Sequence, residues 1–310
     1  MTPRRALGGL ALGAALLASG LAWRGVVDFD LSKHRTRDLS FEAGGAHLAG
    51  TLVLPETCDD GPVAVLVHGD GPQDRWSGQG YLPLVSALLE ACIGVYSWDK
   101  PGVGDSTGDW LGQSMADRAV EAGTALQAVR AALGPERRIG FLGLSQAGWI
   151  VPRASAVVGP EFVVLTGVAV DWAAQGAYFD SRSDGRQGPP ASPERAAFNT
   201  RNGAANAEAD LPGLQGRVLA LWGAEDLNVD PIANAATYEA LAPRGTVAEV
   251  IPGATHSLLR SRWFQGQLQT DWPWWKVTLF TAMGRRAYAP DVLERITGWI
   301  NGPGLSGARR

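Results

Sequence analysis

The chain has 310 residues, of which 45% are hydrophobic and 19% are charged, and its formal net charge is −4 at pH 7. Length and composition allow a large buried core, which excludes a mainly disordered protein. The slightly acidic balance and the lack of a basic stretch with interleaved aromatic residues argue against nucleic acid as a partner.

Residues 1–23 differ from the rest of the chain. Arg4 and Arg5 precede an uncharged segment over residues 6–22, ALGGLALGAALLASGLA. This pattern is typical of a signal peptide or a membrane anchor, and small residues at 18, 20 and 22 suit cleavage by a signal peptidase. Both interpretations stay open, and both predict an exported protein that is periplasmic, secreted or anchored on the outer side of the membrane.

Residues 24–37 are polar without a periodic pattern, which predicts a linker. The following segment, residues 38–56, predicts two strands that are joined by a turn at Gly44 and Gly45. Residues 63–67 form a continuous apolar run, which is typical of a strand that is buried on both faces of a parallel sheet.

Helical and strand patterns then alternate, which predicts one α/β domain over residues 38–301 with a mainly parallel sheet, followed by a tail at 302–310. Predicted helices cover residues 81–91, 114–133, 146–155, 232–241 and 290–301. Predicted strands cover residues 93–98, 138–144, 162–166, 217–222 and 246–251.

Two segments interrupt the alternation. Residues 172–214 are rich in Gly, Pro, Ser and charged residues, with a helix start at Ser192 and Pro193, and they predict a small lid. Residues 257–288 contain DWPWWK and four of the twelve tryptophans. We expect an aromatic wall or surface patch there, since tryptophan both fills pockets and favours membrane interfaces.

The segment GLSQAG places Ser145 between a predicted strand and a predicted helix. It resembles the nucleophile-elbow motif G-x-S-x-G, except that Ala147 stands at the position of the second glycine. The extra methyl group of Ala147 is expected to pack against a small residue or a gap.

A serine nucleophile needs a histidine base and a carboxylate that orients the histidine. In elbow enzymes the acid and then the histidine follow the serine, and of the four histidines only His256 does so. The candidate acids after the strand 217–222 are Glu225, Asp226 and Asp230. Each candidate follows a predicted strand, where the active sites of open α/β sheets lie.

Five motifs between about residues 38 and 300 carry a family resemblance: LVHGDGPQDR, YSWDKPGVGDSTGD, GLSQAG, GAEDLNVDP and PGATH. The chain resembles the α/β-hydrolase superfamily, in particular an esterase-like branch with HGxGP...DR and DKxGxGxS loops. The resemblance implies an eight-stranded, mostly parallel sheet flanked by helices. It also implies that Asp226, three residues after Gly223, is the acid, with Asp230 in reserve.

The resemblance further implies an oxyanion hole formed by the backbone N–H groups of Asp70 and Gln146. The superfamily usually has a small neutral residue at the position of Asp70, so we expect the Asp70 side chain to face away from the pocket, toward Arg75. His68 is expected to be structural and to anchor this loop.

The two cysteines, Cys58 and Cys92, precede the strands 63–67 and 93–98. The resemblance makes these strands parallel neighbours, so both cysteines would lie at one edge of the sheet. They form either a disulfide or a pair of buried thiols.

No cofactor or metal is expected. The glycines of PGVGDSTG miss the spacing of dinucleotide-binding and P-loop motifs, and the histidines and cysteines lack a metal-ligand spacing. We therefore expect a serine hydrolase that cleaves small-molecule carboxylic esters through an acyl-enzyme intermediate. The alternatives are an amide or peptide hydrolase with the same triad, and a non-catalytic binding protein on a hydrolase scaffold.

Overall fold

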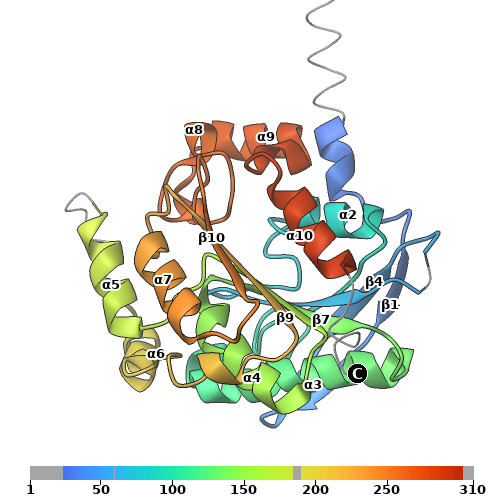
Figure 1. The fold of residues 1–310 in the computed structure, drawn as a ribbon, viewed down its shortest axis with the longest axis horizontal. Helices are drawn as coiled ribbons and strands as arrows, with labels where there is room; N and C mark the ends of the chain where they lie inside the picture. Colours follow the sequence, from blue (N-terminus) through green and yellow to red (C-terminus); the bar gives the residue numbers. More distant parts are fainter. Residues whose placement is uncertain (1–23, 59, 184–189, 303–310) are drawn as a thin grey trace, which may run out of the picture.

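The computed structural model describes residues 24–58, 60–183 and 190–302, so the predicted leader and nearly all of the predicted tail lie outside the described residues. Within these residues, one sheet contains eight strands (Figure 1). Their order is β1 (Arg35–Asp38), β4 (Gly50–Leu54), β6 (Gly94–Trp98), β5 (Val63–Val67), β7 (Ile139–Leu144), β8 (Phe162–Thr166), β9 (Arg217–Gly223) and β10 (Val247–Ile251). The β1–β4 and β4–β6 pairs are antiparallel and the other neighbours are parallel, which confirms the predicted sheet.

The central strands are fully buried, which explains their apolar sequences. All residues of β5, β6 and β8 are buried, because helices cover both faces of the sheet. The structure gives β5 and β8 the same bounds as the sequence predicted.

Helices cover the two faces of the sheet and complete two apolar clusters. On one face lie α3 (Met115–Leu133), α4 (Val151–Val158) and α7 (Pro231–Leu241). On the other face lie α2 (Leu82–Glu90) and α10 (Val292–Asn301). Figure 1 shows α3 and α4 below the sheet, with α2 and α10 above it.

The prediction of a linker over residues 24–37 is wrong. The helical turn η1 (Val27–Phe29) packs against the body, and the buried Asp28 accepts hydrogen bonds from the backbone and side chain of Arg285, both at 2.8 Å. Arg35 begins β1, whose four residues are all exposed. This strand joins the sheet through backbone pairing with β4, and the Arg35 side chain adds a hydrogen bond to the Pro55 carbonyl at 3.2 Å. Its polar sequence gave no strand signal.

The predicted hairpin at Gly44 and Gly45 is present as β2 (Phe41–Ala43) and β3 (Ala46–Leu48). These two strands form a separate small sheet between β1 and β4, and the chain returns to the main sheet at β4.

Short helices fill the two insertions. Residues 172–214 contain α5 (Trp172–Ser181), α6 (Pro193–Asn202) and η4 (Leu211–Gly213), and Ser192 caps α6 as predicted. Residues 257–288 contain α8 (Ser261–Phe264), η5 (Gln269–Asp271), α9 (Trp274–Met283) and η6 (Gly284–Ala287). The remaining turns are η2 (Trp110–Gly112) and η3 (Ser145–Trp149). None of the helices in the described part of the chain is both long and apolar enough to cross a bilayer.

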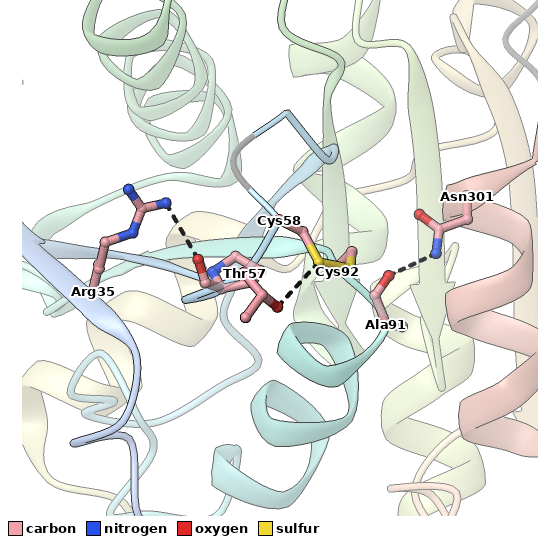
Figure 2. Close-up of a disulfide and its surroundings, with 7 residues drawn as sticks. Arg35, Thr57, Cys58, Ala91, Cys92 and Asn301 are labelled. Atoms are coloured by element: carbon pink, nitrogen blue, oxygen red, sulfur yellow. Dashed lines mark hydrogen bonds between the residues drawn. A yellow bond between two sulfur atoms is a disulfide. The ribbon is translucent and has the colours of Figure 1, made fainter.

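Cys58 and Cys92 form a disulfide, with a Cα–Cα distance of 5.5 Å (Figure 2). They lie where the parallel strands β5 and β6 begin, at the edge of the sheet that the sequence predicted. Close by, the Asn301 side chain donates a hydrogen bond to the Ala91 carbonyl at 2.8 Å. The bridge therefore sits at the amino ends of the parallel strands, beside the end of α10.

Candidate active site

Ser145 stands on a sharp turn at the carboxyl end of β7. Its φ angle is 51°, in the left-handed region that a serine seldom adopts. Such local strain is found at functional positions and is the geometry of a nucleophile elbow. The predicted helix 146–155 differs in detail, because the chain first forms the tight turn η3 and only then α4.

Ala147, which departs from the elbow motif, fits because its neighbour on β7 is a glycine. A Cβ atom added to Gly143 would lie 2.7 Å from the Ala147 Cβ. The Ala147 methyl group is fully buried and occupies this space. The prediction that it packs against a small residue is confirmed.

Ser145, His256 and Asp226 form one hydrogen-bonded chain. The Ser145 hydroxyl lies 3.0 Å from His256 Nε2, and His256 Nδ1 lies 2.8 Å from Asp226 Oδ2. Gly167 makes room for the histidine, because a Cβ atom there would lie 2.7 Å from the His256 carbonyl oxygen. The three side chains come from the carboxyl ends of three different strands, β7, β9 and β10.

Of the three candidate acids, Asp226 is the one that contacts His256. Its free oxygen Oδ1 accepts hydrogen bonds from the backbone N–H groups of Asn228 and Val229 at 2.7 and 3.0 Å. Asp230 instead caps α7 through two backbone N–H groups, and Glu225 is exposed. Asp226 is buried and held by backbone on one oxygen, so its other oxygen is fixed toward His256.

The loop that carries Asp70 lies against Ser145. A Cβ atom on Gly69 would come within 3.3 Å of the Ser145 Cβ. Among the described residues, neither the Asp70 N–H nor the Gln146 N–H has a hydrogen-bond acceptor. The two residues are also joined directly, since the Gln146 side chain donates to Asp70 Oδ1 at 3.1 Å.

The expectation that the Asp70 side chain faces away toward Arg75 is wrong. The carboxylate lines the cavity above Ser145 and forms a two-point ion pair with Arg195 of α6, at 2.8 and 2.5 Å. Burial raises the pKa of this carboxyl, but the hydrogen bonds and charge of Arg195 outweigh burial and hold the pKa below its usual value. Asp70 is thus ionised and paired with Arg195 of α6.

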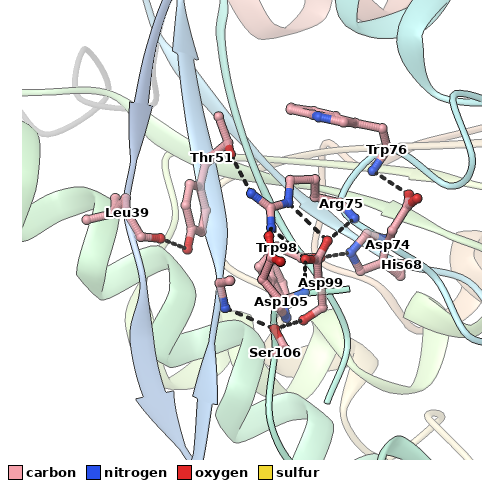
Figure 3. A network of polar contacts seen from close by, with 12 residues as sticks. Leu39, Thr51, His68, Asp74, Arg75, Trp76, Trp98, Asp99, Asp105 and Ser106 are labelled. Carbon is pink, nitrogen blue, oxygen red and sulfur yellow. Dashed lines mark hydrogen bonds and ion pairs between the residues drawn. The ribbon is translucent and has the colours of Figure 1, made fainter. Parts of the chain in front are cut away.

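Arg75 instead joins the two motif loops to each other (Figure 3). Its guanidinium binds both oxygens of the buried Asp99, with the closest contact at 2.5 Å, and also binds Asp105. The Asp105 N–H donates to Asp99 as well, at 3.0 Å. The DR and DKxGxGxS segments therefore fold as one scaffold beneath the site.

His68 anchors the start of the same scaffold. Its Nε2–H donates to the Trp98 carbonyl at 2.5 Å, and its ring is fully buried. Burial lowers the pKa of His68 to about 3, so the ring is neutral at physiological pH. It makes no hydrogen bond to Ser145, in keeping with the structural role expected for it.

Comparison with solved structures identifies the fold. An esterase from Pyrococcus furiosus matches with a TM-score of 0.58 and 17% identity over 84% of this chain and 94% of that one. A bacterial membrane phospholipase A matches with a TM-score of 0.53 and 19% identity over 99% of both chains. Est1E from Butyrivibrio proteoclasticus, solved with ferulic acid, matches with a TM-score of 0.53 and 17% identity over 85% of this chain and 96% of that one.

The chain has the α/β-hydrolase fold. No protein-family model matches it, and no curated protein matches it by sequence. The α/β-hydrolase fold places binding sites at the carboxyl ends of its strands, which is where Ser145, Asp226 and His256 meet.

Two buried basic side chains, Lys100 and Arg118, support the segments that carry Asp70 and Gln146, and neither was predicted from the sequence. Lys100 is fully buried and donates to the carbonyl oxygens of Gly69 and Gly71 at 2.6 and 2.8 Å. Burial lowers its pKa well below the usual value, yet even a neutral amine keeps two N–H donors for these carbonyls. Arg118 of α3, also buried, donates to the Gln146 side chain.

A cavity of about 410 Å³ lies over Ser145. The core of the fold supplies Trp149 and Val229, and α5 of the lid insertion supplies Trp172 and Phe179. Leu268, from the second insertion, stands at the edge of the cavity and is largely exposed. The cavity therefore has an apolar wall, and the polar side chains of Asp70, Gln146 and Arg195 line the part beside Ser145.

Proposed function

We propose that this protein is a serine hydrolase that cleaves carboxylic esters. The observation that carries the proposal is the continuous hydrogen-bonded set of Ser145, His256 and Asp226 on a strained elbow. A hydroxyl at 3.0 Å from an imidazole whose other nitrogen is held by a buried carboxylate is the arrangement that activates serine.

In the proposed reaction, Ser145 Oγ attacks the ester carbonyl while His256 Nε2 takes its proton. Asp226 holds the imidazole in the required tautomer and stabilises the imidazolium that forms. His256 then protonates the departing alcohol, which leaves an acyl group on Ser145. Water, deprotonated by the same histidine, attacks the acyl-enzyme, and the acid is released.

The tetrahedral intermediates would place their oxyanion between the N–H groups of Asp70 and Gln146. A carboxylate on Asp70 is unfavourable for this role, because its charge opposes the developing negative charge. Here the charge is offset by the two-point ion pair with Arg195 and by the nearby buried Arg118. The unusual residue is therefore compatible with an oxyanion hole.

We propose a small ester with an apolar portion as the substrate. The apolar wall formed by Trp149, Trp172 and Phe179 supports this, and so do the esterases among the structures that share the fold. We also propose that the protein is exported. The Cys58–Cys92 disulfide supports export, because such bridges persist in oxidising compartments.

The test uses a panel of aryl esters of increasing acyl length with matched amides. Ser145→Ala is expected to lose at least about a thousandfold in kcat/KM on the best ester, because the nucleophile is removed. A fluorophosphonate probe is expected to label Ser145, as shown by mass spectrometry of the labelled peptide. Ser257→Ala, beside the catalytic histidine, is the control and should keep both activity and labelling. Full activity of Ser145→Ala, or a probe on another residue, would contradict the proposal.

A further inference from the structure

We infer that the outer face of α9, together with the N-terminal turn packed against it, docks on a phospholipid bilayer surface. Eleven large hydrophobic side chains are exposed in the described part of the chain, and seven of them come from just two segments. These are Val26 and Val27 in the N-terminal segment, and Trp263, Leu268, Trp274, Trp275 and Val277 in the second insertion. The inference concerns a surface outside the catalytic set and does not depend on the proposed hydrolysis.

The exposed face of α9 has the character of an interfacial helix. Trp274 is 79% exposed and Val277, one turn later on the same face, is 52% exposed. The next residues on this face, Thr278 and Thr281, turn their hydroxyls back to helix carbonyls at 3.0 Å. Their hydrogen-bonding groups are thus satisfied within the helix, and this face carries no charged residue.

Charged groups lie at the border of this face. The amine of Lys276 donates to the Gln265 carbonyl and lies 5.7 Å from the Trp275 ring centre. Arg262 lies over the Trp263 ring at 4.7 Å. Tryptophans flanked by cations match the depth of lipid headgroups, where the ring contacts the acyl boundary and the cation contacts phosphate.

The position of the N-terminal segment selects a bilayer rather than a second protein as the occupant. Gly25 packs against the backbone of α9 at Ala282, and the Phe29 and Phe280 rings meet at 5.8 Å. Figure 1 shows the first described turn beside α9 at the same end of the molecule. The uncharged residues 6–22 precede Arg24 by one residue. If residues 6–22 remain on the chain and are inserted in a bilayer, the chain connection at Arg24 brings that bilayer close to α9.

The same insertion connects this face to the cavity. Leu268 lies between α8 and α9 in the chain and borders the cavity over Ser145. A bilayer at α9 would therefore be one short loop away from the cavity entrance, which fits an ester substrate that is delivered from lipid.

A single-label depth measurement tests the inference on the full chain. Since Cys58 and Cys92 are bonded, Val277→Cys supplies one free thiol for an environment-sensitive fluorophore. The labelled chain is reconstituted in vesicles of phosphatidylcholine and phosphatidylglycerol with or without brominated acyl chains. The matched controls are Val157→Cys on α4 and Ile232→Cys on α7, which are 82% and 67% exposed and lie on the opposite face of the sheet.

Brominated lipid is expected to reduce the fluorescence at position 277 at least about twofold and to leave both controls unchanged, because an interfacial helix face is buried several ångströms deep. Adding Trp274→Ser should lessen that quenching without changing hydrolysis of a water-soluble ester. Equal behaviour of the three labels would overturn the inference. So would protection of position 277 without vesicles in a species that sediments as a dimer, since that result assigns the face to a second copy.

Discussion

Lys100 occupies a place where a charged side chain is costly. It is fully buried, and its hydrogen bonds go to backbone carbonyls of the loop that carries Asp70. A buried amine that binds the carbonyls of two alternate residues fixes the direction of the peptide groups between them. We interpret Lys100 as a positioning residue, which aims the Asp70 N–H at the site without contacting substrate.

Lys100→Met is therefore expected to lower kcat about tenfold to a hundredfold with KM changed less than about twofold, because misplacing one oxyanion donor weakens transition-state binding. The urea midpoint should change little, since removing a buried amine also removes its desolvation cost. Steady-state kinetics and urea unfolding measure the two effects. Lys276→Met is the matched control, since Lys276 also donates to a carbonyl but lies outside the site. An equal loss in both variants, or a change in KM alone, contradicts the role.

Some residues of the candidate site could be predicted from the sequence and others could not, and the difference lies in what each residue contacts. Ser145, Asp226 and His256 follow strands, so strand prediction brings them to one edge of the sheet. Lys100 follows a strand too, but its partners are backbone carbonyls. Every residue has a backbone carbonyl, so the sequence does not indicate which ones Lys100 binds. Arg195 lies 125 residues from Asp70, within an insertion whose placement no local pattern dictates.

At the level of elements, one ion pair joins α6 to the loop that carries Asp70. Arg195 binds Asp70 with both terminal nitrogens and packs its guanidinium against the Phe198 ring at 5.0 Å. The pair is partly exposed, so its contribution to stability is small. Its larger effect is on charge, because it offsets a carboxylate that stands beside the proposed oxyanion position.

Arg195→Gln is accordingly expected to lower kcat/KM about tenfold, with less than about 1 kcal/mol lost in the free energy of unfolding. Adding Asp70→Asn should restore most of the activity, because the unpaired charge is then removed. Ester hydrolysis kinetics of the two single variants and the double variant measure this coupling. Arg153→Gln, which breaks the ion pair between Arg153 on α4 and Asp210 before η4, serves as the control. Strictly additive losses in the double variant would contradict this explanation.

Strands with an apolar sequence could be predicted. Elements that are held in place mainly by backbone hydrogen bonds could not. β5 and β8 are continuous apolar runs that lie in the middle of the sheet. β1 has only exposed, mostly charged side chains and pairs through its backbone with β4. The 3-10 turn η3 after Ser145 was also missed, because the elbow geometry overrides a sequence that suits a continuous helix.

At the scale of the whole molecule, the disulfide and the candidate site lie at opposite ends of the parallel strands. Cys58 and Cys92 are 34 residues apart and stand where β5 and β6 begin. Ser145 and its partners stand where strands end. The disulfide can therefore stabilise the fold without contacting the residues of the candidate site.

Protein isolated without reductant is expected to show no titratable thiol after unfolding. Cys58→Ser combined with Cys92→Ser should lower the free energy of unfolding by about 3 to 4 kcal/mol, because the open chain gains conformational entropy. Activity of the folded variant on a soluble ester should stay within about twofold of the parent. Thiol titration, urea unfolding and kinetics provide the three measurements. Two free thiols in the isolated protein would contradict both the bridge and the proposed export.

Arg285 determines how freely the folded domain can turn relative to its N-terminal segment. An unstructured linker of the fourteen residues first predicted would allow the folded body to swivel over roughly 20 Å. Arg285 instead binds the buried Asp28 and also Glu90 of α2, which fastens the segment to two other parts of the fold. The N-terminal segment therefore cannot turn freely relative to the folded body. If residues 1–23 are held at a surface, this attachment leaves no free linker between residue 24 and the folded body, so the body stays close to that surface.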